Sequence, residues 1–236
     1  MITTVLFDLD GTLLPMDQEE FVAEYMKRLC MKAAPYGYDP KTLPAAVWKG
    51  TGSMVANDGS KANEDAFWDT FSAVVGKDAR VDIPMFQSYY ENEFNGVAEV
   101  CGTNPKAAQA VALCKELGFR IGLATNPLFP EIATRNRAKW NGIDVDDFEI
   151  YTTYEDSYHS KPNPAYFTEV ADRMGVNPAD CLMVGNDATE DLAAAKIGMK
   201  VFLVTDCLIN TNDVDISAVP QGNFDDLMDY LRGLNA

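Results

Sequence analysis

Short apolar runs, separated by segments of helical pattern, occur at the N-terminus and through the second half of the chain. They are rich in Val, Ile and Leu, a composition that suits strands of a sheet covered on both faces. Because these runs alternate with helical patterns, the sequence predicts an α/β fold built on a doubly wound parallel sheet. The predicted strands lie at residues 2–8, 119–125, 148–153, 181–185 and 200–205.

The helical segments between these runs carry recurrent start and stop signals. Asn104-Pro105 opens a predicted helix over 105–117, Asn163-Pro164 opens another over 164–174, and a glycine follows each. Asn at the cap, Pro in the first turn and Gly after the last turn are each favoured at those positions. Further helices are predicted at 130–140, 188–197 and 224–233.

Residues 16–98 follow a different pattern, in which apolar residues recur at helical spacing and no run has the character of a strand. We therefore predict an all-helical domain over 16–98, inserted after the first strand into a core domain made of 1–15 and 99–236. Such a domain could move relative to the core, and the alternative is an ordinary helical subdomain that never moves. Its expected helices are one that carries Phe21, Val22, Tyr25, Met26 and Leu29, and three at about 40–50, 63–75 and 83–95.

Composition narrows the class of protein. With 236 residues, 47% hydrophobic and 23% charged, the chain is typical of a soluble globular protein. Its net charge of −17 argues against a nucleic-acid or anionic-membrane partner, because both require Lys and Arg gathered on one face. The same charge would repel an anionic substrate, so a phosphate site needs local positive charge, which a bound metal and a lysine could supply.

Cysteine and histidine usage excludes several chemistries. The five cysteines are widely separated and lack metal-type pairing, so reduced, buried thiols are expected. His159 is the single histidine, which makes a histidine-based triad or a zinc site improbable. A strand-like run begins at the N-terminus and no apolar stretch reaches membrane-spanning length, so we expect a cytoplasmic protein, as a monomer or homodimer.

The run from Val5 to Leu13 carries the most informative chemistry. It ends in Asp8 and Asp10, followed by Gly11 and the hydroxyl of Thr12. An extended backbone points residues i and i+2 to the same side, and two like charges that close repel unless a cation or a shared proton relieves them. The pair therefore indicates a divalent metal site rather than a packing device.

The segment DLDGTL, residues 8–13, resembles the first motif of the haloacid dehalogenase superfamily, whose commonest members are magnesium-dependent phosphatases. The resemblance implies a Rossmann-like core, with Asp8 as nucleophile and Asp10 as general acid/base. It also implies that the insertion is a helical cap between the first and second motifs. Magnesium would then join the Asp8 carboxylate, the Asp10 carbonyl and an acidic residue of the fourth motif.

Two further segments match the family order. Thr125 and Asn126 follow the second core strand, where a hydroxyl and an amide could hydrogen-bond phosphoryl oxygens, and they resemble the second motif. Lys161, in SKPNPAYF, precedes a helix start and adds a point charge to the positive end of that helix. This segment resembles the third motif, so Lys161 is predicted to be catalytic and to bind phosphate.

The fourth segment is Gly185-Asn186-Asp187, with Asp191 four residues further on. It resembles the fourth motif but departs from its common Gly-Asp form. One alignment places Asn186 where the first Asp stands, and the other places Asp187 and Asp191 in both acidic positions. We prefer Asp187 as the metal ligand, because a hard cation favours an anionic oxygen. Thr12, Asn186 and Asp191 are predicted to support the site.

Together the four segments predict a magnesium-dependent phosphate monoester hydrolase that acts on a small phosphorylated metabolite through an aspartyl-phosphate. A phosphomutase of the same superfamily is the nearest alternative, and a requirement for a bisphosphate activator would distinguish it. A metal-independent haloacid dehalogenase and a non-catalytic phospholigand-binding protein are less favoured. Substrate choice is expected from the helical cap, where Lys49 and Ser53 lie in an apparent turn at 48–53 and are candidate contacts.

Overall fold

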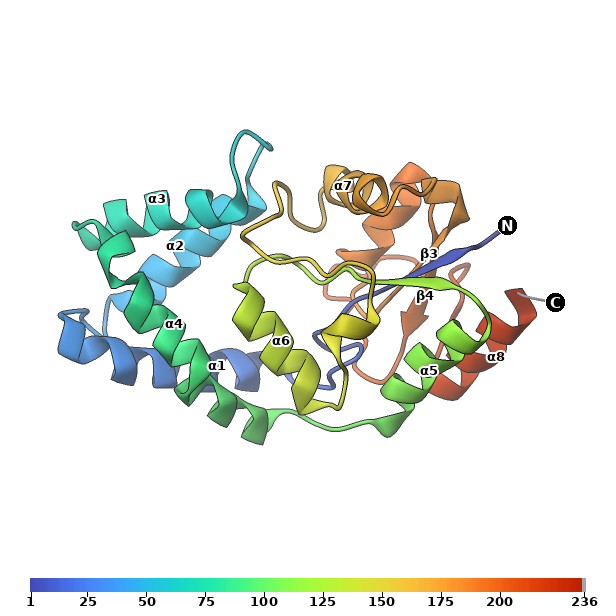
Figure 1. Cartoon of the computed structure of the whole chain (residues 1–236), viewed down its shortest axis with the longest axis horizontal. Coiled ribbons are helices and arrows are strands. Elements are labelled where there is room, and N and C mark those ends of the chain that lie inside the picture. Colours follow the sequence, from blue (N-terminus) through green and yellow to red (C-terminus); the bar gives the residue numbers. More distant parts are fainter. Residues whose placement is uncertain (235–236) are drawn as a thin grey trace.

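The computed structural model describes residues 1–234, which form a parallel sheet flanked by helices and joined to a group of helices at one end (Figure 1). The sheet order is β2-β1-β3-β4-β5, with every neighbouring pair parallel. This confirms the predicted α/β fold with a doubly wound parallel sheet. The strands are β1 (Thr4–Phe7), β2 (Arg120–Leu123), β3 (Cys181–Gly185), β4 (Lys200–Val204) and β5 (Gln221–Gly222).

The core helices follow the predicted start signals. The Asn104 side chain accepts a hydrogen bond from the Lys106 amide, and the Asn163 side chain accepts one from Ala165, so both asparagines cap helices as expected. The core helices are α5 (Pro105–Glu116), α6 (Glu131–Trp140), α7 (Pro164–Met174), the 3₁₀ helix η6 (Asp191–Ile197) and α8 (Phe224–Leu234).

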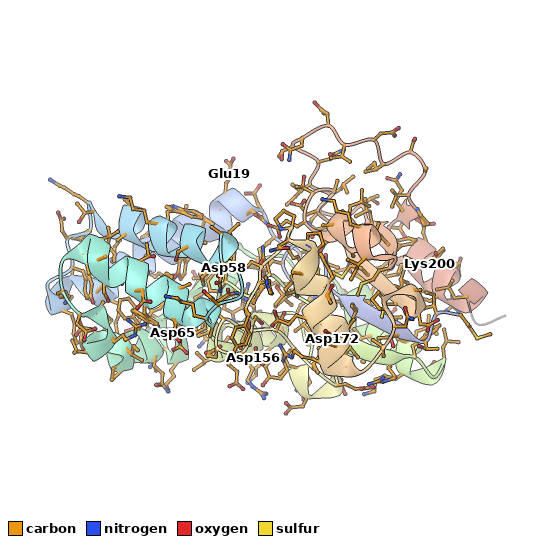
Figure 2. The ribbon with its side chains drawn as sticks, turned by 90° about the horizontal axis from the view of Figure 1, so that it is seen from above. Glu19, Asp58, Asp65, Asp156, Asp172 and Lys200 are labelled. Carbon is orange, nitrogen blue, oxygen red and sulfur yellow. The ribbon has the colours of Figure 1, made fainter. Side chains whose placement is uncertain are left out.

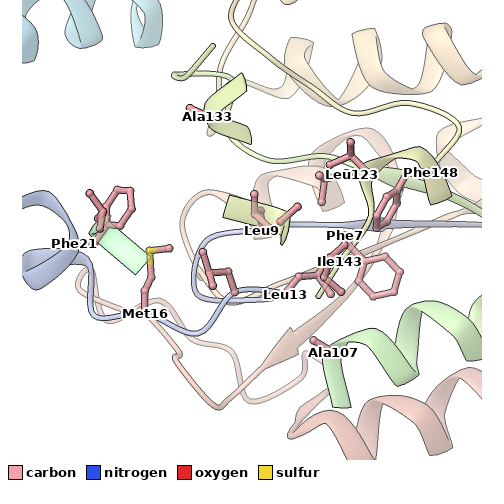
Figure 3. Packing of buried hydrophobic residues seen from close by; sticks show 14 of the residues in the cluster. Phe7, Leu9, Leu13, Met16, Phe21, Ala107, Leu123, Ala133, Ile143 and Phe148 are labelled. Carbon is pink, nitrogen blue, oxygen red and sulfur yellow. The ribbon is translucent and has the colours of Figure 1, made fainter. Parts of the chain in front are cut away.

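Alternate residues of β1 enter two different hydrophobic clusters. Val5 and Phe7 pack into the larger cluster, to which α5 and α8 contribute, while Leu6 packs into a smaller one with residues of α7 and η6. This alternation is the period-2 pattern of a strand covered on both faces. Figure 3 shows Phe7 beside Ile143 and Phe148, with α5 below. β1 is thus fixed at the centre of the fold, and the residue that follows it is held rigidly.

The inserted segment is helical throughout, as predicted. Its two connections to the core run side by side, since Met16 and Cys101 form an antiparallel bridge and the Gly102 amide donates to the Pro15 carbonyl at 2.8 Å. The division into a core domain (1–15, 99–236) and a helical domain (16–98) stays a prediction, which this pairing supports. Its helices are α1 (Gln18–Ala33), α2 (Leu43–Val55), α3 (Asn63–Val75) and α4 (Ile83–Glu91), followed by a 3₁₀ helix (Glu93–Val100).

Three expectations about local structure are wrong. Residues 148–153 pair with β2 through backbone hydrogen bonds at Glu149, Ile150 and Thr152, but only Tyr151 forms a bridge, so the segment is an edge pairing that falls short of the expected strand. The helix expected over 188–197 begins only at Asp191 and is 3₁₀, and the residues before it form a turn in which Asp187 Oδ1 accepts from the amides of Thr189 and Glu190. The expected turn at 48–53 lies within the continuous helix α2.

The surface is strongly acidic, in keeping with the net charge of −17. Exposed carboxylates are spread over both the helical group and the core, as the labelled Asp58, Asp65, Asp156 and Asp172 illustrate (Figure 2). The five cysteines are unpaired, and Cys114 and Cys181 are buried. Across residues 1–234, no helix combines the length and apolarity needed to cross a membrane.

Candidate active site

The loops after β1, β2 and β3 meet at the carboxyl edge of the sheet and form the floor of a cavity of about 350 Å³. This is the edge at which open parallel sheets bind ligands. The cavity lies between the core and helices α1, α2 and α3. Of the predicted core-site residues, Thr12 and Lys161 do not line the cavity. The others lie on its floor together with Glu190, and they are Asp8, Asp10, Thr125, Asn126, Asn186, Asp187 and Asp191.

Asp8 is the most constrained of these groups. It directly follows β1 and is buried, with one carboxylate oxygen 2.8 Å from the Lys161 ammonium and the other 3.3 Å from the Thr12 hydroxyl. Burial raises the pKa of Asp8 to about 7, and the nearby charges of Asp191 and Asp10 add to this, while Lys161 opposes it. The carboxylate therefore has a defined orientation, and Lys161 offsets only part of the cost of its buried charge.

Lys161 joins two of the predicted segments. Its side chain is fully buried, and its Nζ lies 2.8 Å from Asp8 and 2.6 Å from Asp191. Burial alone would lower the pKa of Lys161, but the carboxylates of Asp191 and Asp8 raise it well above its usual value. The Lys161 amide also donates to Asn126 Oδ1 at 3.1 Å. The lysine is thus a fixed cation beneath the cavity floor.

Asp10 is held by a residue that sequence reasoning missed. Its Oδ2 accepts from Arg137 Nη1, and the Arg137 side chain is fully buried, with its guanidinium 4.3 Å from the Phe129 ring centroid. Asp10 Oδ1 is buried and has no partner within residues 1–234. The sequence could have indicated this role through the position of Arg137 on α6, where it lies on the same buried face as Ala133 and Ala138.

The fourth segment divides its roles among three neighbours. Asn186 Oδ1 accepts from the Thr12 hydroxyl at 2.9 Å, so Asn186 contacts the first loop directly. Asp187 lines the cavity, and its Oδ1 accepts from the amides of Thr189 and Glu190. Asp191 accepts from Lys161 and from the amides of Asn186 and Asp187, which braces the whole loop.

The second segment is fixed through its backbone. The carbonyl of Thr125 accepts from the Thr152 hydroxyl at 2.6 Å and from the Tyr166 hydroxyl at 2.8 Å. Asn126 Nδ2 donates to Glu190 Oε2 at 3.0 Å. Glu190, a second residue that sequence reasoning missed, has its pKa raised to about 8, mainly by burial. No motif signal distinguished it from an ordinary helix carboxylate.

The two candidates in the helical domain do not line the cavity. The Ser53 hydroxyl donates to the carbonyls of Gly50 and Ala66, at 2.6 and 2.7 Å, and Lys49 lies on the exposed side of α2. Both belong to a regular helix rather than to a turn, because Gly50 lets α2 pack closely on α3: a Cβ there would lie 2.6 Å from the Phe67 ring. The α2 residues that do line the cavity are Val47, Trp48, Thr51 and Val55.

We expect the metal-free protein to lose stability as the pH rises. The folded-state pKa values of Asp8 and Glu190, about 7 and about 8, exceed the ordinary values of 3.8 and 4.5. A raised pKa gives stability that is full below the ordinary value and is lost as the pH rises through the folded-state value. Thermal unfolding in a chelator should therefore give a higher Tm at pH 5 than at pH 8.5.

The Glu190→Gln variant should reduce this difference in Tm. Glu116→Gln removes the same charge from an exposed helix position and is the matched control. Equal pH dependence of the two variants would show that surface charge, rather than the buried carboxylate, causes the loss.

This fold and this set of polar groups at the carboxyl edge of the sheet define an α/β enzyme with an acidic site. A protein-family model described as haloacid dehalogenase-like hydrolase matches residues 2–198. The chain therefore belongs to the haloacid dehalogenase-like hydrolase family, and the predicted class of enzyme is confirmed.

Individual relatives agree with this assignment. The chain is 25% identical over 240 residues to the "Putative phosphatase YhcW" of Bacillus subtilis, with 100% of both proteins covered. It is 27% identical over 201 residues to a phosphoglycolate phosphatase of Neisseria gonorrhoeae, covering 83% of this chain and 76% of that protein.

Solved structures share the fold at low sequence identity. A HAD phosphatase from Thermococcus onnurineus matches with a TM-score of 0.60 and 20% identity, over 98% of this chain and 99% of that chain. The L-2-haloacid dehalogenase from Xanthobacter autotrophicus matches with a TM-score of 0.58 and 16% identity, over 99% and 100%. Because both a phosphatase and a dehalogenase match equally well, these structures support the fold and do not separate the two reactions.

Proposed function

We propose that this enzyme is a magnesium-dependent phosphate monoester hydrolase that acts on a small phosphorylated metabolite through an aspartyl-phosphate on Asp8. The observation that carries the proposal is the environment of Asp8: a buried carboxylate on the cavity floor, oriented by Lys161 and Thr12, with Asp10 two residues further along. The phosphatase names of the relatives support the same reaction.

The proposed reaction has two steps. An oxygen of Asp8 attacks phosphorus, the bond from phosphorus to the ester oxygen breaks, and Asp10 Oδ1 gives its proton to the departing oxygen. Asp10 Oδ1 then takes a proton from the water that attacks the aspartyl-phosphate, which releases phosphate and regenerates Asp8. Arg137 occupies Asp10 Oδ2 and thereby leaves Oδ1 as the oxygen that exchanges the proton.

The retained second aspartate weighs against the dehalogenase reaction. A carbon–halogen bond leaves as halide and needs no proton on the departing atom, so Asp10 would have no acid role there. The buried Arg137 would then hold the Asp10 carboxylate in place although that carboxylate takes no part in the dehalogenation step. A phosphomutase would use the same groups and is the remaining alternative.

The site residues fit a divalent cation. Five carboxylates (Asp8, Asp10, Asp187, Glu190 and Asp191) lie on the cavity floor, against the two buried cations Lys161 and Arg137. Asp8 and Asp187 both present carboxylate oxygens to the cavity, and hard oxygen donors of this kind suit Mg²⁺.

We assign the ion to Asp8, the Asp10 backbone carbonyl and Asp187. Within residues 1–234, no three acidic, His or Cys side chains converge enough to enclose a metal by themselves, so a backbone carbonyl and exogenous oxygens must complete the shell. When bound, Mg²⁺ would neutralise negative charge on the transferring phosphoryl group.

Asp187→Asn should weaken Mg²⁺ binding by about 10- to 100-fold, whereas Asn186→Ala should weaken it less. The reason is that Asp187 offers an anionic oxygen to the cavity, while Asn186 Oδ1 is engaged by Thr12. Isothermal titration of Mg²⁺ into each variant measures this directly, independently of turnover. A larger loss in Asn186→Ala would transfer the ligand role to Asn186.

The proposed function is tested by phosphate release from a panel of phosphorylated metabolites, with Mg²⁺ and with a chelator. We expect release that the chelator abolishes. A folded protein that releases no phosphate with Mg²⁺ present contradicts the proposal. A reaction that requires a catalytic amount of bisphosphate and yields an isomer would identify the mutase instead.

A further inference from the structure

The walls of the cavity differ sharply from its floor. Above the carboxylates, the cavity is enclosed by apolar and aromatic side chains from α1, α2, α3, α4 and the loops after β2 and before α7. Within residues 1–234, no Lys, Arg or His is among the residues that line it. The wall residues include Phe21, Trp48, Phe67 and Phe129, and the polar groups of the wall, such as the Thr51 hydroxyl and the tyrosine hydroxyls, are uncharged.

This lining bears on the charge of the leaving group. An anionic group on the organic part of the substrate would face neither a basic side chain in the wall nor positive charge from the floor, which carries more carboxylates than cations. Burying a charge without a partner is costly, and the net charge of −17 adds long-range repulsion. The cavity therefore disfavours substrates with a second anionic group.

The aromatic residues form a defined surface rather than a scatter of side chains. The rings of Phe21 and Tyr25 are nearly parallel, at 4° with centroids 6.4 Å apart, and Phe129 meets Tyr25 edge-on at 5.6 Å. The ring centroid of Phe67 on α3 lies 6.5 Å from that of Tyr154, which belongs to the loop before α7. Flat, apolar walls of this kind suit a planar or compact apolar body.

Trp48 gives an independent indication. Its side chain is 52% exposed, which is unusual for so large an apolar residue, and yet it lines the cavity. An exposed tryptophan at the entrance of an apolar cavity gains most if a ligand covers it. The position of Trp48 thus points to an organic body that extends from the carboxylate floor to the entrance.

We propose that the substrate is the phosphate monoester of an uncharged aromatic or aralkyl alcohol. Its apolar body would fill the part of the cavity lined by Phe21, Trp48 and Phe67. This inference rests on the proposed phosphatase function and specifies its substrate class. It differs from what the name of the phosphoglycolate phosphatase relative states, since phosphoglycolate carries a carboxylate on its organic part. In the reaction the neutral alcohol leaves with the proton of Asp10, so no new charge is buried in the apolar wall.

The test compares benzyl phosphate with its 4-carboxy derivative, which has the same reacting bond and one added charge. We expect kcat/KM to be at least about 100-fold higher for benzyl phosphate, which corresponds to the cost of an unpaired buried charge. Phosphoglycolate should be poor for the same reason. Comparable values for the neutral and carboxylated esters would overturn the inference and leave the phosphatase proposal intact.

Two variants sharpen the test. Thr51→Lys adds a cation to the wall and should shift the preference toward the carboxylated ester by about tenfold or more, a gain that general damage cannot produce. Trp48→Ala should lower kcat/KM for benzyl phosphate by about tenfold, as loss of an aromatic contact predicts. Tyr36→Ala removes a similarly exposed aromatic residue that does not line the cavity and should leave both values unchanged.

A binding measurement separates failure of the inference from failure of the proposed function. Titration calorimetry with benzylphosphonate and with 4-carboxybenzylphosphonate, each with Mg²⁺, reports recognition without any turnover. Tighter binding of the neutral phosphonate supports the apolar subsite even if no ester is hydrolysed. Equal or reversed affinities contradict it, whatever the enzyme does to phosphate esters.

Discussion

Replacing Asp8 by Asn lowers phosphate release by about 10⁴-fold or more, on the expectation that its carboxylate is the nucleophile. The substitution keeps the size and shape of the side chain and changes only its charge and nucleophilicity. An amide oxygen can still accept from Lys161, so the loop after β1 should keep its structure. The measurement is phosphate release under saturating Mg²⁺, with thermal unfolding of the same preparations.

Stability distinguishes this effect from misfolding. Because burial raises the pKa of Asp8 to about 7, its charge costs folding free energy at pH 8, and the neutral Asn should keep or raise the Tm of the metal-free protein. Asp172→Asn is the matched control, since Asp172 is exposed on α7 (Figure 2) and does not line the cavity. Near-normal turnover by Asp8→Asn would mean that another group attacks phosphorus.

The residues on the cavity floor could be predicted from the sequence because their placement follows from the topology of the sheet. In a parallel sheet the carboxyl ends of neighbouring strands meet, so Asp8, Thr125 and Asn186 had to lie at one edge once their strands were identified. The i, i+2 relation of Asp8 and Asp10 needed only an extended backbone. Local rules of this kind depend little on the rest of the structure.

The predictions of local structure that were wrong concern features that depend on contacts between distant segments. A glycine-containing stretch such as 48–53 resembles a turn until Phe67 of the next helix is seen to fill the space above Gly50. Residues 148–153 have strand composition and hydrogen-bond to β2, but this pairing contains only one bridge, at Tyr151. Strand propensity measures how well a residue fits a partly buried pleated surface. A segment of strand composition therefore becomes a regular strand only where neighbouring segments supply that surface.

Arg137 and Glu190 were missed for a related reason. Charged residues in helices are exposed in most proteins, so a buried one is recognised only by its partner. The partner of Arg137 is Asp10, 127 positions away in the chain, and that of Glu190 is Asn126, 64 positions away. Charged residues on the buried stripe of a helix are therefore the positions at which sequence reasoning should look for partners of a catalytic loop.

Lys161→Met should destabilise the protein by about 3–5 kcal/mol, because it leaves the buried carboxylates of Asp8 and Asp191 facing each other without a cation. Turnover should fall by at least about 100-fold, since Asp8 loses the contact that orients it. The control is Lys61→Met, which removes an exposed ion pair with Asp69 and should change neither property measurably. Denaturant unfolding and phosphate release measure the two effects.

The double variant Asp8→Asn with Lys161→Met separates charge balance from catalysis. Removing one of the two carboxylates that face the vacant cation position should add more stability to Lys161→Met than Asp8→Asn adds to the wild type, so the two changes should be non-additive in unfolding free energy. Turnover should not recover, because the nucleophile is absent. If the changes in unfolding free energy of the two single variants simply add in the double variant, the ion pair of Lys161 with Asp8 contributes little to the fold. Lys161 would then stabilise the protein through its packing against Tyr166 and its other neighbours.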